Sequence, residues 1–390
     1  MKWKFYSLAF VAGMSILTAC SSDDNNDNDG NGGNGNGNEI ENGTILKGTI
    51  TSDVTLAAGN TYKLSGEYIV EEGATLHIEE GVKIIAVYDD IADYILVKQG
   101  GKINAVGTPD KPIVMTSEKE EPGAWGGIHI CGRAHTNAEG GKGSSEIGVA
   151  VYGGNDDADN SGTLQYIRLE YTGFAFDEEH EANGISFYGV GNGTIVDHCQ
   201  AYKGSDDGFE FFGGSVNVSN LVAVSCSDDS FDWTEGWNGK GTNLVAYQED
   251  KSTLGYDCDC LMECDNNGSN NAATPVAHPV LKNLILVGNG GSKQGIRLRA
   301  GTEVEIDNAK VCGKGQPLTV ETALTENALK NGTSKLTNIT LTSELSSKEG
   351  IYTHADFIAV TSNKVDANLS YSSFEDIRKE CSWMNGSWVK

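Results

Sequence analysis

The sequence has 390 residues, of which 50 are glycine, 6 are proline and 9 are cysteine. The many glycines and the lack of long helix-favouring runs favour one turn-rich β architecture over two or three separate domains. Acidic residues outnumber basic ones by 55 to 28, and the net charge of −27 excludes a generic nucleic-acid binder, because phosphate recognition needs a concentrated basic surface.

The first 19 residues have the features of an export signal. Lys2 and Lys4 give a positive start, and the apolar stretch 5–17 that follows is too short to span a bilayer comfortably. The stretch ends in Leu17 to Cys20, which resembles a bacterial lipobox. The resemblance implies that residues 1–19 are a lipoprotein signal peptide and that Cys20 carries a lipid anchor in the membrane. The alternative is a cysteine that follows a plain secretory signal by chance.

The residues after Cys20 predict a tether. Asp23 to Asn38 contains only Asp, Asn and Gly, which cannot bury apolar surface, so residues 20–43 are expected to be a disordered linker. Ser21 to Asp24 resembles the acidic signal that sends Bacteroidota-type lipoproteins to the outer surface. That resemblance implies an outer-membrane protein that faces the cell exterior.

A repeat organises the interior of the chain. Residues 205–214 match residues 227–236 at an offset of 22, which is the length of one β-solenoid turn. The same apolar, polar, apolar triplet occurs at 128–130, 185–187, 262–264 and 296–298. Period-2 alternation predicts that the outer two residues of each triplet point into the core and the middle one points outward.

A second repeated position follows each triplet, and asparagine occupies five of its seven instances. Stacked amides about 4.8 Å apart can hydrogen-bond along a solenoid axis. The pattern resembles the asparagine ladder of right-handed parallel β-helices, although asparagine is also common in ordinary turns. The seven residues are Tyr166, His198, Asn220, Asn243, Asn283, Asn308 and Asn338.

Several longer segments resemble one known family. Residues 68–86, 122–128, 152–162 and 206–214 are similar to Bacteroidota β-helix lipoproteins of the pectin-lyase-like superfamily, and the resemblance covers residues 45–312. It implies an all-β fold with a single right-handed parallel β-helix. We expect this solenoid over residues 44–345, followed by a C-terminal cap at 346–390, in a monomeric protein.

Two stretches break the repeat, which then fades after about residue 340. Residues 131–161 and 248–280 are insertions, which in a solenoid emerge as loops and often gather on the binding face. Tyr371 to Lys390 predicts a short helix or strap that closes the open end of the solenoid, because an uncapped coil exposes apolar core. Its tryptophans are expected to pack in this cap, with sugar stacking as the alternative.

The middle residues of the triplets predict one outward column. Three successive carboxylates in this column stand about one rung apart, and their repulsion depends strongly on solvent exposure. On an open face the column is a solvated stripe, whereas under a loop it requires a cation, raised pKa values or pairing with Arg297. The column consists of His129, Ser186, Glu210, Asp232, Glu263 and Arg297.

Two pairs of acids precede the repeated strands and add charge to the same edge. They are Asp206 with Asp207 and Asp228 with Asp229. Oxygen-rich clusters of this kind suit Ca²⁺, which takes six to eight oxygen ligands. Ca²⁺ is therefore the candidate cofactor, and ordinary turn chemistry is the alternative explanation.

A separate run resembles the first half of a calcium loop. Its candidate ligands are Asp157, Asp159 and Ser161. Arg168 occupies the position of the closing glutamate, which departs from the EF-hand pattern and excludes that family.

Eight cysteines remain after Cys20, and an even number in an oxidising compartment permits up to four disulfides. The spacing alone assigns no pair. Cys258, Cys260 and Cys264 could suggest zinc, but no second cysteine pair or nearby histidine completes a tetrahedral site. Disulfides or buried thiols are therefore favoured over a metal.

The first functional hypothesis is a surface glycan-binding or adhesion module that uses the β-helix face. Trp237 is the favoured aromatic contact because it lies in a turn, whereas the register points Trp233 inward. The expected ligand-binding residues are His129, Glu210, Asp232, Trp237, Glu263 and Arg297.

Two alternatives remain open. One is a polysaccharide-degrading enzyme, either a glycoside hydrolase with a carboxylate pair about 5 Å apart or a uronate lyase in which Ca²⁺ holds the substrate and an arginine removes the proton. The other is a structural envelope lipoprotein. The catalytic candidates are Glu210, Asp232, Glu263, Arg297 and Arg299.

Overall fold

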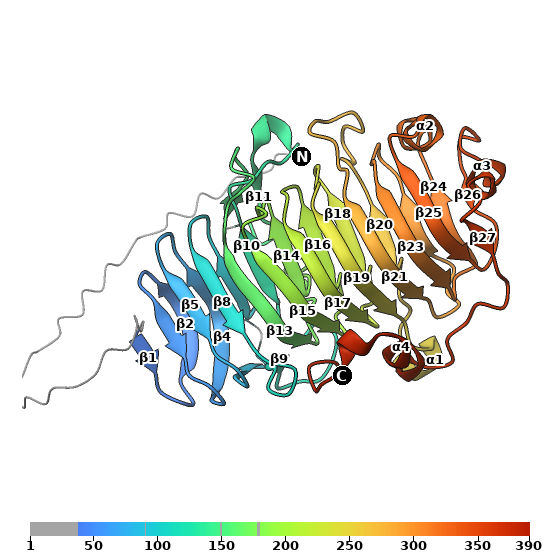
Figure 1. Ribbon diagram of the computed structural model, residues 1–390. Helices are drawn as coiled ribbons and strands as arrows, with labels where there is room; N and C mark the ends of the chain where they lie inside the picture. Colours follow the sequence, from blue (N-terminus) through green and yellow to red (C-terminus); the bar gives the residue numbers. More distant parts are fainter. Residues whose placement is uncertain (1–37, 90, 149, 178–179) are drawn as a thin grey trace, which may run out of the picture. The chain divides into compact units, whose positions relative to one another are not determined.

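The computed structural model describes residues 38–89, 91–148, 150–177 and 180–390. The predicted signal peptide 1–19 and lipidation site Cys20 lie outside these residues. The described chain is a parallel β-helix in which coils stack around one apolar core (Figure 1), which confirms the predicted fold class. The solenoid starts earlier than expected. The last residues of the predicted tether form strand β1 (Asn38–Ile40), because Ile40 packs against the core.

Each coil contributes one short strand to a first face of the solenoid. The strands of this face pair in parallel and in register from coil to coil. They are the second halves of β2 (Ile45–Ile50) and β4 (Thr61–Val70), then β7 (Tyr94–Val97), β10 (Ile128–Cys131), β14 (Ile185–Tyr188), β16 (Phe209–Phe212), β18 (Phe231–Thr234), β20 (Met262–Cys264), β22 (Gln294–Leu298), β24 (Gln316–Val320) and β26 (Ser346–Ser347).

A longer strand in each later coil bends at its middle and supplies two further faces. Its first half belongs to the second face and its second half to the third face. These bent strands are β13 (Gly162–Glu170), β15 (Ile195–Tyr202), β17 (Asn217–Val224), β19 (Lys240–Tyr247), β21 (Val280–Val287), β23 (Glu305–Cys312) and β25 (Lys335–Leu341).

In the first coils the two halves are separate strands. The second face begins with β1, β3 (Val54–Leu56), β5 (Thr75–Ile78) and β8 (Lys102–Val106). The third face begins with the first halves of β2 and β4, continues with β6 (Lys83–Ala86) and β9 (Ile113–Ser117), and ends with β27 (Lys364–Val365).

The register of the first face confirms the predicted alternation. The outer residues of the triplets are buried in the core, and aromatic side chains stack from rung to rung there. Phe187 and Phe211 stack at a centroid distance of 5.0 Å, and Phe209 and Phe231 at 5.6 Å. The middle residues form the predicted column, since His129 pairs with Ser186, then Glu210, Asp232, Glu263 and Arg297 follow on successive strands.

Trp237 departs from its predicted role as an exposed aromatic contact. It is 1% exposed, stacks on Phe211 at 4.1 Å between ring centroids, and donates its indole N–H to the carbonyl of Val216. The prediction was wrong because the turn after β18 folds the indole back into the core. This tryptophan stabilises the coil and cannot stack on an external sugar.

The bend between the second and third faces carries the predicted asparagine ladder. All seven residues at this position have positive φ, from 52° at Tyr166 to 64° at Asn308. Asparagine tolerates this left-handed conformation better than most residues. The amide of Asn243 donates to Asn220 at 2.8 Å, that of Asn283 to Asn243 at 3.0 Å, and that of Asn308 to Asn283 at 2.9 Å.

The two predicted insertions meet beside the first face. The first carries the short 3₁₀ helix η1 (Glu139–Gly141) and a hairpin of β11 (Gly143–Ser144) and β12 (Val151–Tyr152). The second contains α1 (Lys251–Leu254) and is divided by β20. Asn137 of the first insertion donates to the side chain of Asn266 at 2.8 Å and accepts from that of Asn267 at 3.0 Å. These bonds fix the two loops to each other.

The C-terminal end of the solenoid is closed by α2 (Ala323–Asn331), α3 (His354–Ala359) and their connections, since Leu345, Tyr352 and Phe357 complete the core there. The predicted role of residues 371–390 was therefore wrong.

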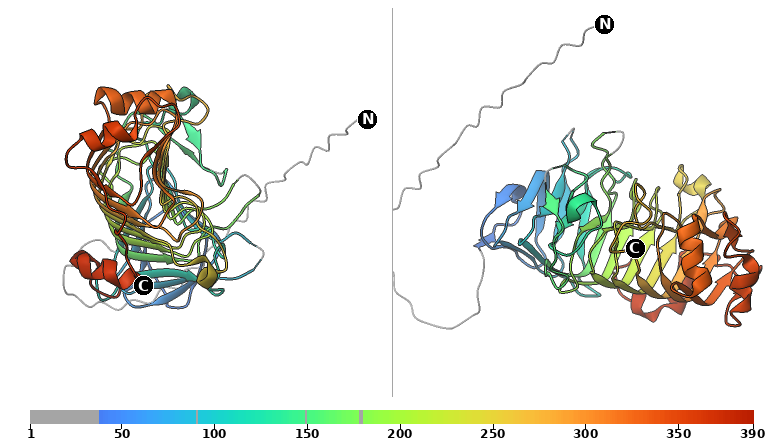
Figure 2. Two further views of the ribbon diagram at one scale, coloured as in Figure 1. Left: turned by 90° about the vertical axis from the view of Figure 1, so that its right-hand side faces the viewer. Right: turned by 90° about the horizontal axis from the view of Figure 1, so that it is seen from above.

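This last segment, with α4 (Phe374–Glu380) and η2 (Ser382–Met384), runs back along the outer side of the third face (Figure 2), and we call residues 371–390 the strap. Ile377 and Trp388 pack there against valines of β17 and β19, because those strands carry apolar residues on both sides. The backbone N–H of Ser387 reaches the carbonyl of Pro109 at 2.8 Å.

Among the helices of the described residues, none combines the length and apolar character needed to cross a membrane.

The asparagine ladder yields a stability prediction. Asn243→Ala removes the two ladder bonds of Asn243 and places alanine, which tolerates the left-handed region less well than asparagine, at φ 60°, so the free energy of unfolding in urea should fall by about 2 to 3 kcal/mol. Asn243→Gly loses the same bonds without the backbone strain and should cost clearly less. Equal losses in the two variants would contradict a role for backbone strain at the bend.

Candidate functional site

The carboxylates of the outward column converge with the turn acids that precede the strands. β16 and β18 place Glu210 and Asp232 on adjacent rungs, and β20 places Glu263 beside Asp232. The turns before β16 and β18 supply two acids each. We call these seven residues the acidic cluster: Asp206, Asp207, Glu210, Asp228, Asp229, Asp232 and Glu263.

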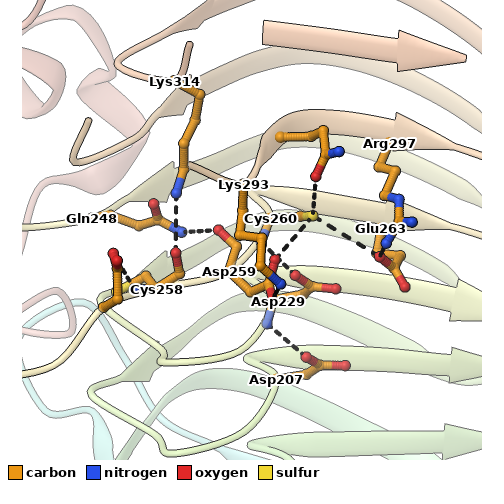
Figure 3. A network of polar contacts seen from close by, with 12 residues as sticks. Asp207, Asp229, Gln248, Cys258, Asp259, Cys260, Glu263, Lys293, Arg297 and Lys314 are labelled. Carbon is orange, nitrogen blue, oxygen red and sulfur yellow. Dashed lines mark hydrogen bonds and ion pairs between the residues drawn. The ribbon is translucent and has the colours of Figure 1, made fainter. Parts of the chain in front are cut away.

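The turn acids are oriented by the backbone of the next coil. Oδ1 of Asp207 accepts the backbone N–H of Asp229 at 2.8 Å, and Oδ1 of Asp229 accepts the backbone N–H of Cys260 at 2.6 Å (Figure 3). Charge-assisted bonds of this kind hold a carboxylate in one place. The same rung-to-rung pairing that builds the sheet therefore stacks the acids.

The members of the cluster form overlapping groups in which potential ligand atoms lie within 4.8 Å of one another. One group joins Asp207, Glu210 and Asp232, and another joins Asp229 and Asp232 to Glu263. Further groups extend the cluster through Asp206 and Asp228 at one side and through Asp259 and Cys260 at the other. The carboxylates are thus continuous across three coils.

Basic side chains neutralise only one edge of the cluster. Arg297 contacts Glu263 at 2.9 Å and Glu321 at 3.3 Å, while Arg299 contacts Asp265 at 2.7 Å and also pairs with Glu263 (Figure 3 shows the Arg297 contact). Within the described ranges, the other six members of the cluster form no ion pair with Lys, Arg or His. The sequence therefore predicted pairing with Arg297 correctly for Glu263 but not for the acids before it.

Burial, together with the neighbouring carboxylates, raises the pKa values of the unpaired acids. The pKa of Asp206 rises to about 8 and that of Asp228 to about 6, in each case through burial first and repulsion from nearby acids second. The same causes raise the pKa well above its ordinary range for Asp207, Glu210, Asp229 and Asp232. Without a cation, the cluster must hold several protons at neutral pH.

Two residues at the other edge were missed by the sequence reasoning. Asn183 donates its amide to Oε2 of Glu210 at 2.6 Å. It stands two residues before its strand, as Asp207 and Asp229 do, so the register could have identified it. Glu146 comes from the first insertion, accepts the hydroxyl of Tyr188 at 3.2 Å, and has its pKa raised to about 7 by burial. No repeat signal marks Glu146, since it lies outside the coils.

His129, the first member of the predicted column, is not exposed to an external ligand. It is fully buried, and its Nε2 lies 2.8 Å from the carbonyl oxygen of Gly126. Burial lowers the pKa of His129 to about 4, so the ring is neutral at physiological pH. Its predicted ligand contact is wrong because Tyr94 and Tyr188 pack against the ring on this part of the first face.

The predicted calcium loop does not join the acidic cluster. Oδ1 of Asp157 pairs with Nδ1 of His135 at 2.6 Å, and Oδ2 of Asp159 accepts the hydroxyl of Ser161 at 3.3 Å. Among the residues that the structure describes, neither Asp157 nor Asp159 belongs to a group of three potential metal ligands. Turn and loop chemistry explains these residues.

The cysteines form no disulfide in the described chain. All eight are buried free thiols, so the predicted option of up to four disulfides is wrong and the buried-thiol alternative holds. Cys264 points into the core, whereas Cys260 contacts the carboxylates of Asp259 and Glu263. The three cysteines of the C-x-C-x3-C run therefore do not converge on one zinc.

The donor set of the acidic cluster fits a hard divalent cation. Its ligand atoms are almost all carboxylate oxygens, which Ca²⁺ prefers in flexible sets of six to eight. One of them, Oδ1 of Asp232, is buried and has no hydrogen-bond partner within the described part of the chain. A buried unpaired carboxylate oxygen costs free energy unless a proton or a metal ion satisfies it.

The chain was compared with family models, with curated proteins and with solved structures, and the family model supports the β-helix architecture. Residues 48–389 match the model of a family described as a pectate-lyase-like β-helix domain. A comparison with curated proteins gave no match. One similar solved structure is the crystal structure of the Dettilon tailspike protein (gp208), with 8% sequence identity and a TM-score of 0.29. The match covers 76% of this chain and 56% of that one.

The raised pKa values predict how stability depends on pH. In EDTA, the acids of the cluster bind more protons in the folded protein than in the unfolded chain between pH 4 and 8, so raising the pH through this window should favour unfolding. The lowered pKa of His129 acts in the opposite direction, but it is one group against six. Each such acid contributes at most about 1.4 kcal/mol per pH unit. Acids with lowered pKa values, such as Asp197 at about 2, act below this window. The melting temperature, followed by circular dichroism, should therefore fall from pH 5 to pH 8.

Two variants separate the acidic cluster from the rest of the charge. Asp232→Asn removes one of the mutually repelling carboxylates and should flatten the decline of the melting temperature. Asp110→Asn changes an exposed acid outside the cluster and should leave the wild-type decline intact. A wild-type melting temperature that rises from pH 5 to pH 8 in EDTA would contradict the raised pKa values.

Proposed function

Because the chain belongs to the pectate-lyase-like β-helix family, we propose that it is a glycan-binding protein whose acidic cluster holds Ca²⁺ and, through it, an acidic polysaccharide. The observation that carries the proposal is the convergence of six carboxylates on two adjacent coils, which form no ion pair with a basic residue in the described part of the chain. A bound divalent cation would offset the repulsion between these carboxylates, which would all serve as its ligands.

The cation would be held by residues of the column and the turns. Asp207, Glu210 and Asp232 would provide one set of oxygens, and Asp229 and Glu263 would extend it. The unpartnered Oδ1 of Asp232 supports a role for this residue at the centre. Ca²⁺ keeps coordination positions for outside oxygens, so a uronate carboxylate could complete its shell.

The anionic ligand follows from the charge of the site. A bare acidic cluster repels uronates, whereas a cation-loaded one attracts them, so binding would require Ca²⁺. Arg297 and Arg299 stand at the edge of the cluster with 26% and 32% of their side chains exposed. They would give a glycan carboxylate further charge-assisted hydrogen bonds.

The location completes the proposal and rests on the sequence alone. We propose an outer-membrane lipoprotein attached through Cys20, with the β-helix at the cell exterior on an Asp/Asn/Gly tether. In that position a monomeric β-helix could adhere to surface or environmental glycans. Cys20 and tether residues 21–37 lie outside the described residues.

The binding proposal is tested with the mature chain carrying Cys20→Ser, which prevents lipidation. Titration calorimetry should detect Ca²⁺ binding, and Asp232→Asn should weaken it by at least about tenfold because a charged ligand is lost. Polygalacturonate or alginate should be retained with Ca²⁺ and released by EDTA. Asp110→Asn serves as the matched control. No Ca²⁺ binding by the wild-type chain would contradict the proposal.

A second candidate function is glycoside hydrolysis. The carboxylate oxygens of Glu210 and Asp232 lie within 4.8 Å of each other on adjacent rungs, close to the spacing of a retaining carboxylate pair. A raised pKa on such an acid suits a proton donor. The lyase alternative is weaker, because Arg297 and Arg299 are both paired with carboxylates and a guanidinium does not release its proton readily.

Hydrolysis is tested by reducing-sugar release from a panel of plant and bacterial polysaccharides, with absorbance for unsaturated ends as the lyase readout. Glu210→Gln should lower any hydrolysis at least about a hundredfold, since it removes the general acid. Asp110→Asn should hydrolyse at the wild-type rate. Full activity in Glu210→Gln would remove Glu210 from the reaction.

A further inference from the structure

A polar groove lies away from the acidic cluster, where the asparagine ladder meets the strap. It is a cavity of about 330 Å³, at the lower end of the size range of small-molecule sites. It uses no residue of the acidic cluster. The lining residues that matter here are Asn243, Asn283, Asn308, Lys310, Glu380 and Trp383.

The ladder ends inside this groove. Each amide from Asn243 to Asn308 donates to the asparagine of the preceding rung, but the amide of Asn338 donates to Asp307 at 2.6 Å instead. The carbonyl oxygen of Asn308 therefore receives no amide from the following rung, and the side chain is exposed. A row of aligned hydrogen bonds polarises its members, so this oxygen is a strengthened acceptor.

The strap adds an aromatic surface and a neutral ion pair. Trp383 of η2 is partly buried and lines the groove, and the fully buried Trp388 lies 6.2 Å from it between ring centroids. Lys310 of β23 pairs with Glu380 of α4. The charges of the two lining residues cancel, so the groove offers amides, a neutralised ion pair and an indole.

We propose that this groove binds a neutral oligosaccharide. The apolar face of a sugar ring would pack on Trp383, and its hydroxyl groups would donate to Asn308 and accept from the ladder amides. An anionic sugar is disfavoured because Glu380 neutralises Lys310. The site is independent of the acidic cluster and needs no cation, so it goes beyond the proposed calcium-dependent binding.

The test uses the mature chain with Cys20→Ser, in EDTA, and three neutral probes: cellohexaose, xylohexaose and mannohexaose. Titration calorimetry should show binding of at least one probe. Trp383→Ala and Asn308→Ala should each raise its Kd by about tenfold, the change expected when one stacking or hydrogen-bonding contact is lost. Asn338→Ala is the matched control, because Asn338 has the same left-handed backbone and lies outside the groove lining, and it should leave Kd unchanged.

Circular dichroism checks that each variant is folded, and Trp383→Phe, which keeps a smaller ring, should give an intermediate Kd. No binding of any probe, or equal losses in Asn308→Ala and Asn338→Ala, would overturn the proposal. Asp232→Asn should bind the neutral probe as the wild type does. The experiments can therefore refute the proposal for this groove and the proposal for the calcium-dependent site independently of each other.

Discussion

The whole structure depends on the in-register stacking of equivalent residues from coil to coil. Parallel pairing repeats every strand position about 4.8 Å further along the axis, so each side chain has its counterpart as its nearest neighbour. Inside, this constraint stacks aromatic rings such as Phe187 and Phe211. Packing in the core therefore fixes the register of the strands, and this register determines which outward side chains are neighbours on adjacent coils.

The same constraint has opposite consequences for two polar residues. Asparagine is both donor and acceptor, so a column of asparagines bonds to itself, as Asn220 and Asn243 do. Ionised aspartate and glutamate accept hydrogen bonds but cannot donate them, so the carboxylates of such a column repel one another. The fold can carry the acids at Asp207 and Asp232 only with protons or a cation among them. An unfavourable column maintained in this way is typical of a functional site.

The features that repeat could be predicted from the sequence, and those that do not repeat could not. The spacing of the triplets located the outward column, and the aligned asparagines located the bend. Trp237 and Glu146 were misjudged or missed because their positions depend on how a turn and an insertion fold back, which no periodicity encodes. The strap was misplaced for a related reason. Its apolar residues indicate that the strap packs against an apolar surface, but the structure is needed to identify that surface as the outward-facing valines of β17 and β19.

The path of the strap affects how this solenoid unfolds and folds. A stack of coils normally has only nearest-neighbour contacts, so it can fray rung by rung from either end. Here the last residues of the chain reach back to Pro109 and Gln200, which ties early rungs to late ones. The strap opposes the unfolding of a single coil between these contacts, so the solenoid should unfold more cooperatively. These contacts can form only after residues 387–390 have been synthesised, so the early coils gain their full protection last.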